Sequence, residues 1–118
     1  MIFEVTDADT AATLGSGDLP VLGTPRMVAW MEAATIATVA GDLPAGSTSV
    51  GTAVRVRHQR PTAVGGRVEV TAEVTAGGVG EKKLTFAVTA VDADGKTVGS
   101  GEIDRAVVER EGFVPGSR

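Results

Sequence analysis

The sequence predicts an α+β fold in which one antiparallel β-sheet wraps around one long central helix. A segment free of helix breakers over residues 27–40 indicates the helix, and strand-like segments separated by glycine-bearing turns follow it. The strands alternate apolar and polar side chains, so their sheet has an apolar face that needs a cover. The helix is the only element available to supply that cover.

The expected helix begins at Thr24, which can act as its N-cap, and Pro25 suits its first turn. Gly41 ends it. Apolar side chains lie on nearly all sides of this segment, which leaves no polar stripe wide enough for a solvated face. We therefore expect the helix to be largely buried.

A short strand is expected over residues 1–6, and residues 7–23 form a long polar connection to the helix. The later strands are expected at 48–59, 66–75, 82–92 and 96–109. Asp94 and Gly95 are a short-turn pair between antiparallel strands, and residues 77–80 suit a hairpin connection. The last three strands should therefore form a meander.

The chain has 118 residues, enough to bury one core but hardly two, so we expect a single domain. That domain spans residues 1–111. Residues 112–118 contain Pro, Gly and Ser and form a loose C-terminal tail.

The composition excludes several classes of function. A net charge of −4 argues against nucleic-acid binding, and the absence of cysteine removes disulfides and thiolate chemistry. The chain has a single histidine and no acidic residues at ligand spacing, so we expect no metal site. It has neither a phosphate-loop motif nor a dinucleotide-binding motif, so we expect no bound cofactor. No apolar stretch is long enough for a membrane span, and the start lacks a basic signal segment, so we expect a cytoplasmic protein.

Glu32 lies in the middle of the apolar helix, where an ionised carboxylate is unusual unless it has a structural or functional role. Burying it without partners would cost several kcal/mol, so it must meet donors, meet a cation or line a wet pocket. One interpretation is a helix residue at a surface or dimer edge. The other is a nucleophile or general base.

His58 is the only histidine, and it ends the first strand after the helix. Strict alternation places it on the helix-facing side of that strand, while Gly51 and the arginines point the other way. The residues expected to share its face are Val50, Thr52, Val54 and Val56. A core histidine is the simpler interpretation, but a carboxylate on the facing helix would tune both groups for proton transfer.

Thr24 has two possible roles, as helix N-cap or as a catalytic hydroxyl beside the backbone N–H groups of the helix start, which suit a developing oxyanion. Thr24 and Glu32 are 8 positions apart, or about 12 Å along a helix. If both act on one carbonyl, either the substrate spans that distance or the site is built from two chains. We expect a homodimer.

Several motifs resemble the hot-dog thioesterases of the fluoroacetyl-CoA thioesterase family. These are Gly23-Thr24-Pro25, the run from Met27 to Glu32, Ser49 to Thr52, Val56 to His58, and Asp104 to Val108. The steps of 8 residues from Thr24 to Glu32 and 26 from Glu32 to His58 are similar to the spacing of that family's catalytic Thr, Glu and His.

The resemblance implies a hot-dog fold and hydrolysis of an acyl-CoA thioester. Glu32 would attack or activate water at the acyl carbonyl, His58 would move protons, and Thr24 would position the reacting groups. Gly51 matches a family glycine near the substrate, where a missing side chain allows close approach. Arg105 matches a family arginine near the end of the last strand, although an exposed strand charge explains it equally well.

One departure concerns specificity. The fluoroacetyl enzymes carry aromatic lid residues in the connection before the helix, and residues 7–23 of this chain contain none. This argues against fluoroacetyl-CoA as the substrate. Two alternatives to a thioesterase stay open, a non-catalytic acyl-CoA or small-ligand binding module and a hydratase or dehydratase on the same fold.

Overall fold

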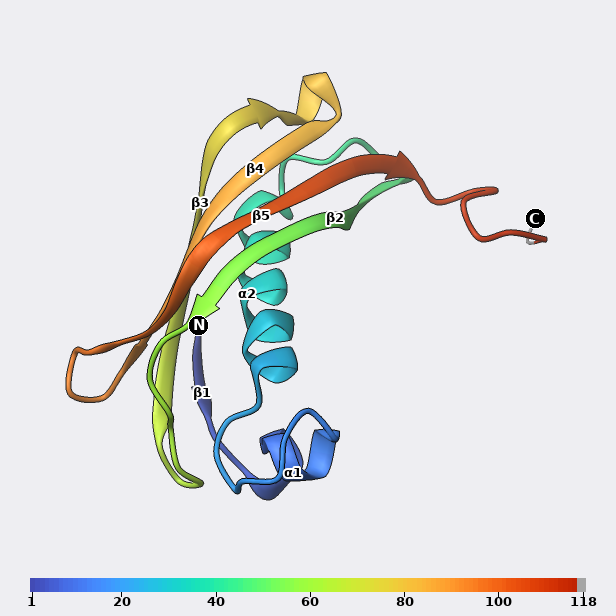
Figure 1. Cartoon of the computed structure of the whole chain (residues 1–118). Helices are drawn as coiled ribbons and strands as arrows, with labels where there is room; N and C mark the ends of the chain where they lie inside the picture. The colour runs from blue at the N-terminus through green and yellow to red at the C-terminus, as the bar shows by residue number, and fades with distance from the viewer. Residues whose placement is uncertain (117–118) are drawn as a thin grey trace.

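The computed structural model of the chain describes residues 1–116. In chain order its elements are β1 (Ile2–Glu4), the 3-10 turn η1 (Asp7–Asp9), α1 (Ala11–Leu14), α2 (Thr24–Val39), β2 (Ser47–His58), β3 (Arg67–Gly78), the 3-10 turn η2 (Val79–Glu81), β4 (Lys83–Asp92) and β5 (Thr97–Glu109). Among these residues no helix is both long and apolar enough to cross a membrane. Residues 117 and 118 of the expected tail lie outside the described residues, whereas residues 112–116 are exposed beyond the end of β5 (Figure 1).

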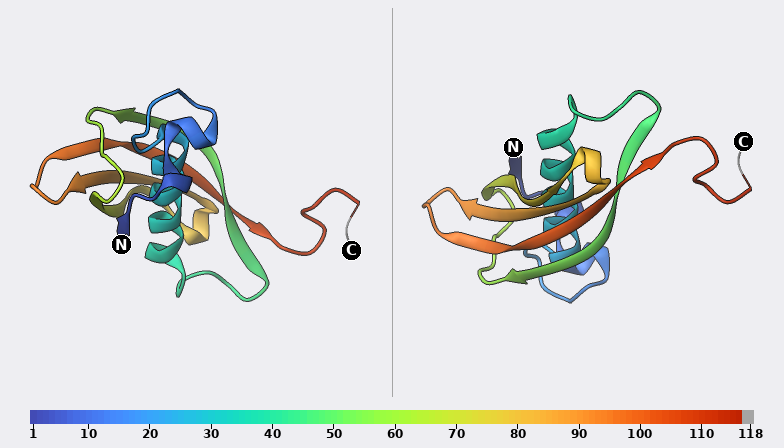
Figure 2. Two further views of the ribbon diagram at one scale, coloured as in Figure 1. Left: turned by 90° about the horizontal axis from the view of Figure 1, so that it is seen from below. Right: turned by 90° about the horizontal axis from the view of Figure 1, so that it is seen from above.

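One curled five-stranded sheet covers α2, as Figure 1 and both views of Figure 2 show. The strand order is β1-β3-β4-β5-β2, and every neighbouring pair is antiparallel. The predicted α+β hot-dog architecture is therefore confirmed, and so is the meander of β3, β4 and β5. After α2 the chain returns to the sheet at β2, which lies at one edge and, among residues 1–116, pairs with β5 alone.

The core lies between α2 and the concave face of the sheet. Phe86, Val88 and Ala90 alternate along β4 and are almost completely inaccessible to solvent, as the period of 2 predicts. From the helix, Trp30 stacks on Phe3 of β1 with ring centroids 4.5 Å apart. The other buried helix residues are Met27, Met31, Ala34, Thr35 and Val39.

A β-bulge in β2 changes the predicted side-chain directions. The register against β5 shifts between Gly51 and Ala53, so Thr52 is an extra residue and alternation restarts after it. Val54, Val56 and His58 face the helix as expected, but in the first half of the strand Gly51 faces the helix and Val50 does not. The prediction that Gly51 and His58 lie on opposite faces was wrong for this reason.

The connection over residues 7–23 is more ordered than a polar loop. It contains η1 and α1, and Thr10 caps α1 by accepting a hydrogen bond from the Thr13 N–H at 3.2 Å. Its return passes beside Ala63, and the Arg26 side chain pairs with Asp9 at 3.0 Å. This connection therefore forms a fixed wall at the start of α2.

The helix is less buried than its apolar sequence predicts. Ile36 is 49% exposed, and together with the exposed Ala29 and Ala40 and the partly exposed Ala33 it forms an apolar stripe at helical spacing. Val54 on the edge strand β2 is 43% exposed on the same side of the sheet as the helix. We call these five residues the open face.

Candidate active site

Thr24 and His58 form the first half of the site. The helix N-cap is Gly23, so the expectation that Thr24 caps the helix was wrong, and Thr24 lies in its first turn. Its hydroxyl is free to turn toward the end of β2, where Oγ1 shares a hydrogen bond of 2.8 Å with Nδ1 of His58. Two elements that are distant in sequence thus bring a hydroxyl and an imidazole together.

The His58 ring is partly buried, and its Nε2 has no hydrogen-bond partner within residues 1–116. Burial lowers the pKa of His58 below its usual value, because desolvation disfavours the charged imidazolium. The neutral ring has one donor and one acceptor nitrogen. Nδ1 is engaged by Thr24, and Nε2 has almost no surface open to solvent in the single chain, where a backbone contact with Arg60 partly opposes the lowering of the pKa.

Glu32 forms the second half of the site with Arg105. Nη1 of Arg105 donates to Oε2 of Glu32 at 3.0 Å, while Nε and Nη2 donate to the hydroxyl and carbonyl of Ser49, each at 2.9 Å. Arg105 is only 5% exposed, and these three hydrogen bonds hold its guanidinium in a fixed orientation. The interpretation of Arg105 as an exposed strand charge was wrong.

Glu32 keeps 35% of its side chain exposed and lies on the open face between Ala29 and Ile36. The buried guanidinium compensates its charge on the inner side, and the remaining surface is open to a ligand. This resolves the question that the sequence raised about an ionised carboxylate in an apolar helix. The carboxylate meets a cation and also faces outward.

Gly51 packs directly under the carboxylate. A Cβ built on Gly51 would overlap with Oε2 of Glu32 and lie 3.5 Å from Nη1 of Arg105. The bulge in β2 therefore serves the site, because it turns the one residue without a side chain toward Glu32.

Replacing Gly51 with alanine should displace Glu32 with little loss of stability, since the tip of a glutamate side chain can move. We expect kcat to fall about 10–100-fold, because a misplaced catalytic group costs that much. Steady-state kinetics and a thermal melt measure the two effects. Gly78→Ala, also on a strand but facing open space, is the matched control. Full activity of Gly51→Ala would show that the position of Glu32 against β2 is unimportant.

Ser49 is the site residue that the sequence did not indicate. It is 9% exposed and supplies two of the three acceptors that hold Arg105. Strict alternation placed it on the outer face of the strand, and only the bulge reverses that direction. No sequence signal marks the bulge.

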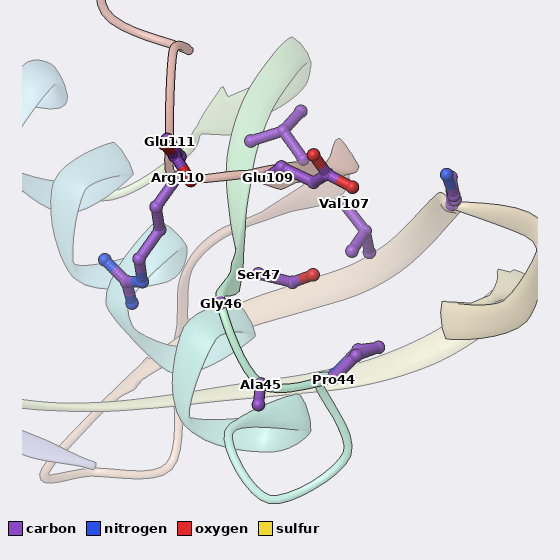
Figure 3. A pocket seen from close by; sticks show the side chains of 10 residues that line it. Pro44, Ala45, Gly46, Ser47, Val107, Glu109, Arg110 and Glu111 are labelled. Carbon is purple, nitrogen blue, oxygen red and sulfur yellow. The ribbon is translucent and has the colours of Figure 1, made fainter. Parts of the chain in front are cut away.

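The two halves of the site do not share a hydrogen bond among the described residues. Thr24 contacts His58 at the start of α2, and Glu32 contacts Arg105 two turns later. A cavity of about 510 Å³ does not join them (Figure 3). It lies between residues 44–47 and residues 107–111, and none of Thr24, Glu32 and His58 lines it.

Comparison with known proteins places the chain in a family. A family profile described as "Fluoroacetyl-CoA-specific thioesterase" matches residues 5–111. The fluoroacetyl-CoA thioesterase of Streptantibioticus cattleyicolor is 39% identical over 93 residues, which cover 79% of this chain and 65% of that protein. The chain thus spans about two thirds of the length of this curated relative.

Solved structures agree with this assignment. The fluoroacetyl-CoA thioesterase FlK is 33% identical, with a TM-score of 0.84 over 92% of this chain and 83% of that one. A FlK variant in complex with acetyl-CoA is 32% identical, with a TM-score of 0.86 over 96% and 87% of the two chains. A thioesterase superfamily member from Thermus thermophilus is 26% identical, with a TM-score of 0.82 over 92% and 79%. The chain therefore belongs to the fluoroacetyl-CoA-specific thioesterase family of the hot-dog thioesterase superfamily.

Proposed function

We propose that the chain is an acyl-CoA thioesterase, which hydrolyses a small acyl-CoA thioester to the free acid and CoA. The observation that carries this proposal is that α2 holds two potentially reactive residues, Glu32 and Thr24, each oriented by a partner from the sheet. A carboxylate is held by a buried arginine at Glu32, and a hydroxyl–imidazole pair stands at Thr24 and His58. A protein that only binds a ligand has no need for both.

In this mechanism Glu32 acts at the acyl carbonyl, as the nucleophile or as the base that takes a proton from attacking water. Arg105 orients the carboxylate through its hydrogen bond. The carbonyl oxygen gains negative charge in the transition state and needs a donor. Pro25 has no N–H, and the N–H groups of Arg26 and Met27 both donate to the Gly23 carbonyl at 3.1 Å, so the Thr24 N–H is the candidate donor at the start of α2. Collapse breaks the C–S bond and releases the CoA thiolate. Where Glu32 is the nucleophile, water then hydrolyses the acyl–Glu32 anhydride to the free acid and restores the carboxylate.

His58 and Thr24 handle the proton and the substrate position. Neutral His58 takes a proton from the attacking water and, as the imidazolium, passes it to the departing sulfur, and the Thr24 hydroxyl fixes the ring through Nδ1. Gly51 leaves room for the Glu32 carboxylate against the backbone of β2, where Arg105 also lies, and so helps to present the carboxylate to the thioester. No metal or bound cofactor is required for these steps.

The pH profile should reflect the lowered pKa of His58. The neutral His58 ring is the active form, so kcat/KM should not change with pH around pH 7. It should fall only at lower pH, as His58 becomes protonated with a pKa below its usual value of about 6.5. A series of kcat/KM values between pH 5 and 8 tests this. An acid limb with its midpoint above pH 6.5 would contradict it.

A homodimer would bring the two halves of the site together. The open face, with Ile36 and Val54, needs a cover, and β2 has an unpaired edge. Two copies of β2 that pair antiparallel about an axis between Val54 and Arg55 would set His58 of one strand beside Gly51 of the other. Glu32 of one chain would then face Thr24 and His58 of its partner. A strictly monomeric, fully active species in sedimentation would rule out this arrangement.

The direct test is release of free thiol from a panel of short, branched and aryl acyl-CoAs. Wild type should release thiol from at least one member. Variants Glu32→Ala and His58→Ala of verified fold should not. If wild type binds several members but releases no thiol from any, the chain is an acyl-CoA binding module instead. Turnover of an enoyl thioester without thiol release would indicate a hydratase.

A further inference from the structure

We infer that the chain acts on neutral acyl groups larger than acetyl, of about four to eight carbons, because a pocket of about 260 Å³, whose one arginine is paired with Asp92, opens beside the Thr24–His58 pair. This inference rests on the proposed function and names the substrate class of the same site. The inference concerns the part of the site that would hold the acyl chain, which lies beyond the reacting carbonyl and is not formed by the catalytic residues alone.

The pocket is formed mainly by the connection before α2. Ala11, Ser16, Val21 and Leu22 come from this connection, and Pro61 closes the wall after the end of β2. All of these side chains are small or aliphatic. Thr24 and His58 belong to the same lining, so the pocket begins where the thioester carbonyl would lie.

Backbone hydrogen bonds fix this wall in place. The Ala11 N–H donates to the Val21 carbonyl at 2.8 Å, and the Leu22 N–H donates to the Thr62 carbonyl at 2.8 Å. The Gly23 N–H donates to the Asp9 carbonyl at 2.9 Å. The pocket is therefore built by paired backbone on both sides of the connection, and its volume follows from the small side chains on that wall.

The pocket offers no free charge. Arg60 is the only cation among its lining residues, and its Nε pairs with Asp92 at 3.2 Å. Hydrogen bonds from the backbone N–H groups of Lys96 and Asp94 lower the pKa of Asp92, so this partner stays ionised at neutral pH. The phosphates of CoA and a carboxylated acyl group both need an unpaired cation. The pocket therefore suits the acyl end of the substrate, and a neutral acyl group.

The volume sets the size of that group. At about 30 Å³ for a water-sized group, 260 Å³ holds roughly eight such groups. An acetyl group places a single methyl beyond the carbonyl and would leave most of the pocket empty. Each further buried methylene should improve kcat/KM about fourfold until the pocket is full.

A kcat/KM series with acetyl-, butyryl-, hexanoyl-, benzoyl- and succinyl-CoA tests the inference. We expect the value to rise from acetyl through butyryl to hexanoyl or benzoyl, and succinyl-CoA to fall below butyryl-CoA. The highest value for acetyl- or succinyl-CoA would overturn the inference and leave the thioesterase intact. Thiol release from no member would instead overturn the proposed function, and the inference with it.

Two variants locate the effect in this pocket. Ser16→Leu fills it from an exposed position and should lower the ratio of kcat/KM for hexanoyl- and benzoyl-CoA to that for acetyl-CoA about tenfold. Val21→Ala enlarges it and should shift the preference toward bulkier acyl groups. Ala12→Leu, an exposed change in α1 outside the pocket, is the matched control. A preference that Ser16→Leu and Val21→Ala both leave unchanged would place the acyl group elsewhere and overturn the inference.

Discussion

Replacing Glu32 with glutamine should lower kcat by about 10³-fold, the largest effect expected for any single change in this chain. Glutamine has the same shape and still offers an oxygen to Nη1 of Arg105, so the local packing persists. It cannot attack a carbonyl as an anion, nor take a proton from water. Thiol release under saturating acyl-CoA measures the change.

The matched control is Glu73→Gln on β3, which removes the same charge from an exposed position outside the site. This control should keep the wild-type rate. Circular dichroism and a thermal melt establish that both variants are folded. A Glu32→Gln enzyme that retains most of its activity would show that this carboxylate is structural.

Replacing Arg105 with alanine should have the second-largest effect, on both stability and rate. Removal of this side chain leaves the Ser49 hydroxyl and carbonyl without their donor and Glu32 without its cation. Since Glu32 is partly solvated, we expect a loss of about 2–3 kcal/mol, which is less than for a fully buried pair. The released carboxylate should cost a further 10²-fold in kcat.

Arg105→Met separates the two consequences. Methionine fills the space without charge, so denaturant unfolding should show a smaller loss of stability than for alanine. The rate should stay low in both variants, because neither orients Glu32. A stable Arg105→Met enzyme with the wild-type rate would mean that the guanidinium matters only for folding.

Much of the fold could be predicted from the sequence. The helix over residues 24–39 and the later strands follow from hydrophobic periodicity and from glycine-bearing turns, which are local signals. The Asp94–Gly95 turn illustrates this, because the Asp92 carboxylate accepts from two N–H groups of the turn and Gly95 has a φ of +79°. Both features are encoded within a few residues.

The site was harder to predict, because its geometry depends on contacts between distant elements. The bulge at Thr52 reverses the direction of Ser49 and Gly51, and a count of alternating residues cannot detect it. Thr24 was expected to cap the helix, and its contact with His58 depends on how the end of β2 reaches the helix start. The resemblance to a family identified the residues, whereas the residue pattern alone left each one with a simpler interpretation.

The apolar stripe on α2 also differs from what the sequence predicts. Its composition predicted burial, but the single chain leaves Ile36 and its neighbours exposed. In a homodimer both statements agree, because the second chain supplies the missing cover. The same pairing would complete the site, so the exposed stripe and the separation of Thr24 from Glu32 have one explanation.

The most direct test of this account is the activity of a mixed dimer. Chains carrying Glu32→Ala and chains carrying His58→Ala are co-expressed with different affinity tags and purified through both tags. Each variant alone should be inactive, but the mixed dimer keeps one site with both residues intact and should release thiol at about half the wild-type rate. A mixed dimer as inactive as its parents, or a failure to purify any through both tags, would contradict a site built from two chains.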